Sequence, residues 1–316
     1  MSTDRRLLQG IAVGLAAASI GALYTVFARW GIGHGMRAVD MTFLRFSIAG
    51  ALTLPVLVRV VRADSAAFFA QWRAWLAVSV LAGPLFGLLM FTALQWAPAS
   101  HAAVFPFTAM SVMGTLMSVW FLKDRLTLRK LSGIAIVIMG LVILSGLELS
   151  SLVGKALWGD ALFIAAGTLW AGFGIVMRKN GLNPLTSTAV ISFSALITYV
   201  PLYVGIVGVD RLLATATAVV VTEALIQGVI AGVGTLYTYS KMVSLLGPAR
   251  AAVFPALAPG IAALLAWPVL DHTPSGLELL GLAVSIAGLV WTVTGSPAKA
   301  TPLPVNPNHL SQRSYS

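Results

Sequence analysis

Polar and aromatic side chains that could bind a ligand are few in this sequence, and most of them lie within long apolar stretches. Trp170 lies deep in one such stretch, and its indole N–H needs a partner that lipid cannot supply. Tyr237 and Lys241, in the segment GTLYTYSK, are four residues apart and therefore share one face of a helix, whereas Tyr239 points elsewhere. Such residues suit a site that binds an organic molecule through rings and a few polar contacts.

Each of these residues also has a purely structural explanation. Trp170 can pack between helices, and Lys241 can extend its ammonium group to the headgroups at the inner end of its helix, which we favour. Tyr237 and Trp170 are the better candidates. The full set of candidate binding residues is Trp170, Tyr237, Tyr24, Phe105, Phe254, Tyr239, His101 and Lys241.

Two titratable side chains could take part in proton coupling. His101 can titrate near neutral pH, although a histidine at a helix end is more often structural. Asp160 could carry a coupling proton, but it follows Trp158 and Gly159 at the start of a predicted helix, where a carboxylate caps backbone amides. We favour the cap for Asp160 and leave a proton or a counter-substrate open as the coupling partner.

The sequence lacks the residue sets and motifs that catalysis would need. Cysteine is absent, so thiol catalysis and thiolate metal sites are excluded. Neither a Ser/His/Asp set at one depth nor a G-x-x-x-x-G-K-[ST] phosphate loop is present. We therefore expect no metal, no cofactor and no enzyme activity, an intramembrane enzyme being the least favoured alternative. Metal-ligand spacing is also missing among the four histidines, His34, His101, His272 and His309.

The composition places these side chains in a membrane. Of 316 residues, 58% are hydrophobic and 9% are charged, whereas roughly a quarter of a soluble domain is charged. A helix that crosses the roughly 30 Å hydrocarbon core needs about 20 apolar residues, and lipid tolerates no unpaired backbone amides. The sequence predicts an all-α integral membrane protein with ten transmembrane helices, at Leu8–Ala28, Met41–Val61, Trp75–Trp96, Ala99–Leu122, Leu131–Leu147, Ala156–Met177, Thr186–Val207, Val221–Val243, Ala251–Leu270 and Gly276–Thr294.

The net charge of +10 does not indicate nucleic-acid binding, because the charged residues lie in the gaps between apolar spans. Counted alternately through the loops, fifteen of the twenty Lys and Arg residues fall on one side and five on the other, the five including Arg45 just inside the second span. The positive-inside rule then places both termini in the cytoplasm of a cell whose inner membrane holds the protein. Residues 1–6 form the predicted cytoplasmic N-terminus, and the proline-rich residues 296–316 form a disordered cytoplasmic tail.

One phrase occurs twice in the chain. PASHAAVFP at residues 98–106 returns as PARAAVFP at residues 248–255, and Gly133 and Gly140 then match Gly281 and Gly288 in order. The chain therefore divides into two five-helix repeats, residues 7–147 and 156–295. Because five is odd, the second repeat must cross the membrane in the opposite orientation. This plan is typical of secondary transporters that alternate access to a central site.

Helix-breaking prolines and a charged residue inside the spans are candidates for gating. Pro106, Pro255 and Pro259 are expected to interrupt the fourth and ninth helices and to free backbone carbonyls. Arg45 lies about one turn inside the second helix, so its side chain could reach the outer interface and avoid a burial cost of about 2.5 to 3.5 kcal/mol. A role in gating or folding is favoured over substrate binding for Arg45.

The sequence resembles the drug/metabolite transporter superfamily, and its EamA family in particular. The similarity is clearest in GPARAAVFPALAPGIAALLAWPVLDHTPSGLELLGLAVSIAGLV, residues 247–290, and extends to LWGDALFIAAGTLWA and FLRFSIAGALTLP at residues 157–171 and 43–55. It covers about residues 7 to 295. The sequence departs from the family pattern at Gly21, where a tryptophan is common, and at Asp124, where glutamate is usual.

The resemblance implies ten helices around a central cavity lined mainly by helices 1, 3, 4, 6, 8 and 9. It implies a small-molecule substrate such as an amino acid or derivative, another small metabolite or a cationic drug, moved by gradients without ATP. Export is the commoner direction in the family. A channel and an importer of a small metabolite or vitamin remain alternatives within the same fold, and the oligomeric state is not predicted.

Overall fold

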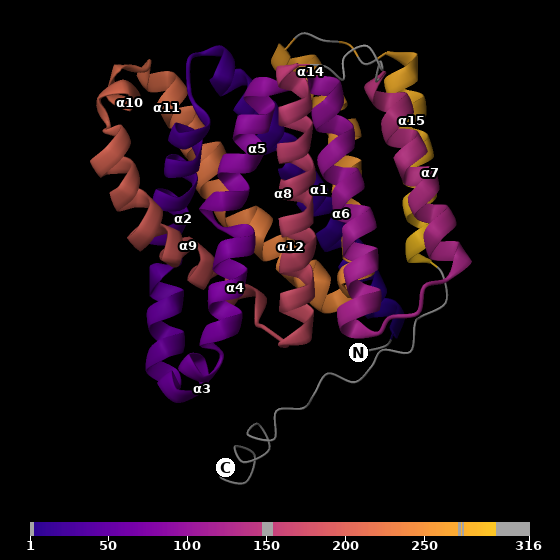
Figure 1. The fold of residues 1–316 in the computed structure, drawn as a ribbon, viewed down its shortest axis with the longest axis horizontal. Helices are drawn as coiled ribbons and strands as arrows, with labels where there is room; N and C mark the ends of the chain where they lie inside the picture. The colour runs from indigo at the N-terminus through magenta and orange to yellow at the C-terminus, as the bar shows by residue number, and fades with distance from the viewer. Residues whose placement is uncertain (1–2, 147–153, 271–272, 274, 295–316) are drawn as a thin grey trace.

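A computed structural model describes residues 3–146, 154–270, 273 and 275–294 (Figure 1). All regular structure in these residues is helical, and ten spans are long and apolar enough to cross a membrane, as predicted. The predicted tail at residues 296–316 lies outside the described residues. The first half contains α1 (Thr3–Gly33), α2 (Ala38–Ala63), α3 (Ser65–Ala70), α4 (Trp72–Ala82), α5 (Pro84–Trp96), α6 (Ala99–Leu122) and α7 (Leu128–Ser145). The second half contains α8 (Lys155–Lys179), α9 (Pro184–Leu202), η2 (Tyr203–Val207), α10 (Asp210–Ala214), α11 (Thr217–Glu223), η3 (Ala224–Ala231), α12 (Gly232–Leu246), α13 (Pro248–Ala251), η4 (Phe254–Leu257), α14 (Ala258–Leu270) and α15 (Gly276–Val293).

Local capping residues define where several of these helices begin. The Thr127 hydroxyl accepts a bond from the Lys130 amide at the start of α7, and the Asn183 side chain caps α9 in the same way. Ser275 and Glu278 form a reciprocal capping box at the start of α15. These caps satisfy amide groups that the helix itself leaves unpaired.

Among the described residues, the third and ninth spans are broken and the seventh and eighth contain the π-helical segments η2 and η3, so the irregularities differ between the halves. The third span breaks between α4 and α5 at Gly83, directly before Pro84, and the eighth contains the π-helical segment η3. The ninth span separates into α13, η4 and α14 around Pro255. The fourth span was expected to break as well, but α6 is continuous through Pro106, so that prediction was wrong. A proline inside a helix removes one amide donor, and a membrane helix can absorb that loss without ending.

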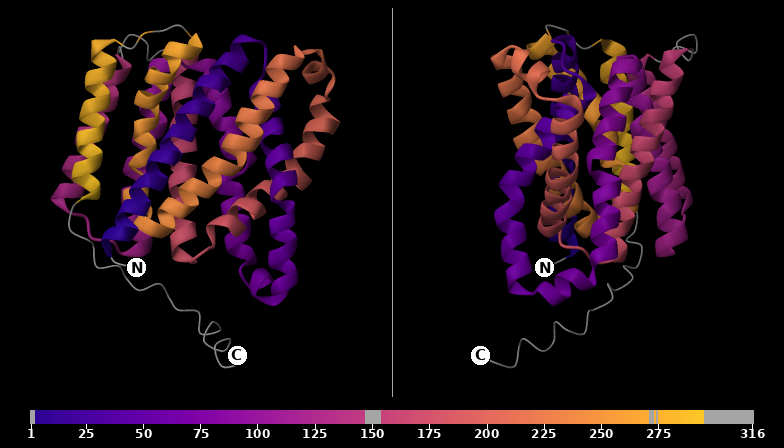
Figure 2. Two further views of the ribbon diagram at one scale, coloured as in Figure 1. Left: turned by 180° about the vertical axis from the view of Figure 1, so that it is seen from behind. Right: turned by 60° about the vertical axis from the view of Figure 1, so that its left-hand side comes forward.

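The helices of the two halves pair in a pattern that is preserved when the halves are exchanged. The helix α1, indigo in the left view of Figure 2, packs against α12 and α14 of the other half, and its counterpart α8 packs against α5 and α6 (Figure 1). The two remaining large contacts join a helix to its own counterpart, α2 to α9 and α7 to α15. An exchange of halves therefore converts each principal contact into another that is observed, as an inverted repeat requires.

The contact between α7 and α15 is built on two pairs of glycines. A Cβ atom on Gly133 would lie 3.2 Å from the Gly288 carbonyl oxygen, and one on Gly140 would lie 2.8 Å from that of Gly281. Gly133 corresponds to Gly281 in the repeat, and Gly140 to Gly288, so the two contacts are images of each other. Small residues let membrane helices approach to backbone contact, which replaces the hydrophobic driving force that lipid does not provide.

Candidate functional site

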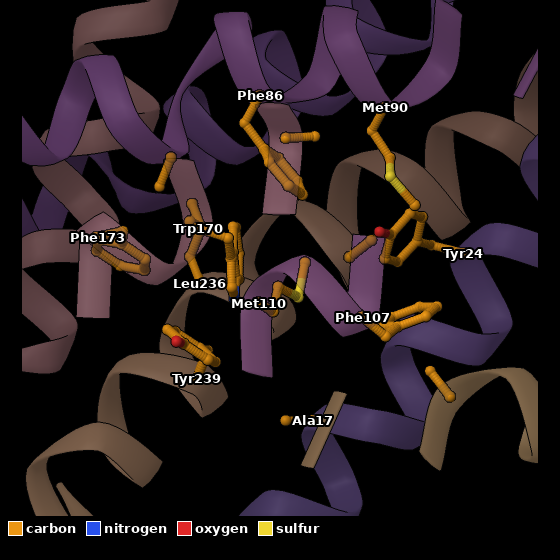
Figure 3. Packing of buried hydrophobic residues seen from close by; sticks show 14 of the residues in the cluster. Ala17, Tyr24, Phe86, Met90, Phe107, Met110, Trp170, Phe173, Leu236 and Tyr239 are labelled. Carbon is orange, nitrogen blue, oxygen red and sulfur yellow. The ribbon is translucent and has the colours of Figure 1, made fainter. Parts of the chain in front are cut away.

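Trp170 lies in a cluster of aromatic rings at the centre of the molecule. Its side chain is 3% exposed, and its ring centroid lies 4.6 Å from that of Phe86, 5.0 Å from that of Tyr239 and 5.4 Å from that of Phe173 (Figure 3). These rings come from α5, α8 and α12, which belong to the third, sixth and eighth spans. The cluster therefore joins both halves of the chain. Its three spans are among those that the family resemblance places around the central cavity.

The two tyrosines on α12 lie in different surroundings. Tyr239 is buried and packs against Trp170, whereas Tyr237 is 38% exposed on another face of the helix. One turn before Tyr237, a Cβ atom on Gly234 would lie 3.0 Å from the Ile20 side chain of α1, so that space is filled. Lys241 is half-buried on the same face as Tyr237. Spacing alone identified the two faces of α12 but not which of them turns toward α8.

A second group of buried rings borders the Trp170 cluster. Figure 3 shows Tyr24 and Phe107 on the far side of Met110 from Trp170. Tyr24 of α1 is 6% exposed and meets Phe91 edge to face, with 6.4 Å between ring centroids. The buried rings therefore extend from α8 to α1.

The two repeat-related phenylalanines occupy different surroundings. Phe254 is buried against Gly14 of α1, whereas Phe105 is half-buried with its ring centroid 5.6 Å from that of His101. Pro255 and Pro259 belong to the broken ninth span, and Pro106 presents its carbonyl oxygen to Gly167 of α8. The asymmetry between α6 and the ninth span thus extends to the side chains beside the prolines.

Arg45 is buried rather than extended to the membrane interface. Its side chain is 1% exposed, its guanidinium carbon lies 5.2 Å from the centroid of the Tyr24 ring, and Nη2 donates a 3.5 Å hydrogen bond to the Ala231 carbonyl. The expectation of an interfacial side chain fails because α2 begins at Ala38, which places Arg45 about two turns inside the helix. Among the described residues, neither Nε nor Nη1 of Arg45 has a hydrogen-bond partner, and no carboxylate lies within 4.0 Å.

Two buried polar residues of the eighth span were missed in the sequence. Gln227 Nε2 donates to Glu223 Oε2 at 3.0 Å and to the Tyr24 carbonyl at 3.1 Å, and both side chains are fully buried. Oε1 of Gln227 has no donor among the described residues, and Oε1 of Glu223 lies against Gly31 of α1. The available signal was the pair Glu223 and Gln227, one helical turn apart in the apolar stretch VVVTEALIQGVIAG. An ionisable residue in such a stretch marks a functional site by default.

His101 and Asp160 are joined across the two halves. Nδ1 of His101 lies 2.8 Å from Oδ1 of Asp160, and both side chains are buried. The expected capping role of Asp160 was wrong, because α8 already begins at Lys155 and Asp160 is too far along it to reach the free amides of its first turn. The two candidates for proton coupling therefore form one unit.

Comparisons with known proteins agree with this geometry. The model of the EamA-like transporter family matches residues 8–146 and again residues 157–294. The chain belongs to the EamA-like transporter family. It is therefore a multi-pass membrane transporter, built from two copies of the family domain.

The individual relatives share less than 30% sequence identity with this chain. A "Probable amino-acid metabolite efflux pump" of Escherichia coli (strain K12) is 28% identical over 65% of this chain and 71% of its own length. A Salmonella typhimurium protein of the same name is 27% identical over 67% of this chain and 73% of its own length. A solved crystal structure with 19% identity covers 89% of this chain and 96% of its own at a TM-score of 0.61, which shows the same fold.

Proposed function

We propose that this transporter exports a small amino-acid-like metabolite across the inner membrane by alternating access, with both termini in the cytoplasm and no enzymatic activity. The observation that carries the proposal is the pattern of helix contacts, which is preserved when the two halves are exchanged. Because the halves share one fold, each can adopt the conformation of the other, and the protein then opens to the opposite side of the membrane. The names of the two bacterial relatives support efflux and an amino-acid-related substrate.

The difference between α6 and the ninth span gives this mechanism a definite form. Here α6 is continuous, and its counterpart is broken around Pro255. In the opposite state the exchange predicts a bend at Pro106 and a straighter ninth span. The Trp170 cluster lies between these elements, and we assign substrate contact to Trp170, Tyr239 and Tyr24.

The buried pair of His101 and Asp160 is the proposed coupling site for a proton. It connects α6 to α8, which belong to different halves, so a change in its charge would act on the contact that must rearrange. Exchange against a counter-substrate is the alternative mode of coupling, and it would not require a proton to be carried by this pair.

Metabolite profiling of cells that express the protein tests the proposed export. The medium and the cytosol are compared between cells with the unmodified chain and cells with a correctly inserted Trp170→Ala variant. We expect at least one small metabolite to accumulate in the medium only with the unmodified chain. Accumulation inside the cell would instead indicate import, and no difference for any metabolite would reject the proposal.

A further inference from the structure

We infer that Arg45 and Gln227 bind the carboxylate and the ammonium group of a zwitterionic amino-acid substrate, with Glu223 supplying the negative charge beside them. This inference rests on the proposed function, since it names the chemical class of the molecule that is moved. It is carried by three fully buried side chains, and among the described residues Nε and Nη1 of Arg45 and Oε1 of Gln227 have no hydrogen-bond partner.

The guanidinium group of Arg45 requires an anion. Arginine stays charged in proteins, and an isolated buried charge is unfavourable unless it is paired. Among the described residues, the only acceptor for Arg45 is the Ala231 carbonyl at 3.5 Å, and the Tyr24 ring covers one face of the guanidinium group. Nε and Nη1 are left with N–H groups that a carboxylate would accept, and arginine matches carboxylate geometry better than other cations do.

The acceptors for an ammonium group lie on the neighbouring face of the eighth span. Glu223, Gln227 and Ala231 follow one another at intervals of four residues, so they share one side of the helix. Glu223 holds the Gln227 amide nitrogen, and this leaves the Gln227 amide oxygen without a donor. Gln227 donates to the Tyr24 carbonyl and Arg45 lies over the Tyr24 ring, so the two polar side chains converge on the same residue of α1.

The apolar part of the substrate would lie toward the rings. The Arg45 guanidinium group lies over the Tyr24 ring, and Figure 3 shows Met110 between Tyr24 and Trp170 in the same buried cluster. The arrangement therefore recognises the charged groups at one end and an uncharged side chain at the other.

Binding to the purified, full-length protein in detergent tests the inference. The probes are the twenty protein amino acids and, for each one, the C-terminal amide and the desamino acid. We expect at least one amino acid to raise the unfolding temperature, and its amide and desamino analogue to bind about tenfold or more weakly. Equal affinity of the acid and its amide, or no binding of any of the twenty, would overturn the inference without any substitution being made.

Variants assign the two charged groups to their residues. Arg45→Gln should remove the preference for the acid over the amide, Arg45→Lys should retain part of it, and Glu223→Gln should weaken the amino acid but not the desamino acid. Arg211→Gln, at an exposed arginine of α10, is the matched control and should bind as the unmodified chain does. Unchanged binding by Arg45→Gln would contradict the assignment. Export of a metabolite that lacks a carboxylate would also reject it and leave the proposed export intact.

Discussion

Nδ1 of His101 lies 2.8 Å from Oδ1 of Asp160, and this contact ties the first turn of α6 in one half of the chain to α8 in the other. Both side chains are buried, so water does not screen their interaction. Because the contact joins the two halves that must move, a gain or loss of one proton there would directly change the relative stability of the two conformations.

Asp160→Asn should separate coupling from substrate exchange. The substitution keeps an acceptor for His101 but removes the ionisable group. In proteoliposomes we expect uphill transport driven by a pH gradient to fall by roughly a hundredfold, while exchange at equal concentrations on both sides continues. Asp210→Asn, at an exposed position of α10, should leave both activities unchanged. Retention of uphill transport by Asp160→Asn would show that the proton moves elsewhere or that exchange drives transport.

Trp170→Ala should abolish export while the protein remains folded and inserted. The substitution removes a ring that contacts Phe86, Phe173 and Tyr239, and therefore removes the packing contact that joins the third, sixth and eighth spans. Trp120→Ala is the matched control, because Trp120 is 71% exposed on the surface of α6. The rate of metabolite appearance in the medium is the measurement. Equal losses in both variants would mean that the Trp170 cluster has no special part in binding.

Cysteines at positions 105 and 254 should report alternating access. The native chain has no cysteine, so each single variant carries one reactive group. Because the two positions are equivalent in the repeat, we expect substrate to raise the labelling rate of one and lower that of the other. A single cysteine in place of exposed Leu8 provides the baseline. Changes of the same sign at both positions would be inconsistent with exchange of the two conformations.

Gly281→Ala should destabilise the protein. The added Cβ would lie 2.6 Å from the Gly140 carbonyl oxygen and against the backbone of Leu144, so α7 and α15 would have to separate. Overpacking of this kind costs about 1 to 3 kcal/mol, which should appear as a lower unfolding temperature in detergent. Gly276→Ala is the control, since nothing lies within 4 Å of a Cβ there. If the two variants unfold at the same temperature, the glycine pairs do not set the approach of these helices.

The sequence was sufficient for features that repeat or that extend over whole spans. Ten helices, their order and the duplication followed from apolar length and from the phrase shared by residues 98–106 and 248–255. The bends did not follow, because Pro106 and Pro255 are equivalent in sequence and only the second lies in a broken helix. Whether a proline ends a membrane helix depends on the neighbouring helices, which one sequence does not reveal.

The polar contacts were harder to predict than the helices. His101 and Asp160 are 59 positions apart and were considered separately, each with a plausible local role. Arg45 was placed at the interface because its depth was judged from a helix start that lies three residues too late. Glu223 and Gln227 lie inside an apolar stretch whose pattern predicts only a transmembrane helix. In each case the partner lies on another span, and only the packing of the halves brings it within reach.

The glycine contact between α7 and α15 has a further consequence. Gly133 meets Gly288 while its counterpart Gly281 meets Gly140, so each half contributes the same surface to the joint. A single half that inserted in both orientations would carry a complete interface for its own inverted copy. The contact therefore contains what a dual-topology homodimer of five-helix subunits would need, and the fused chain keeps that geometry while leaving each half free to acquire its own polar residues.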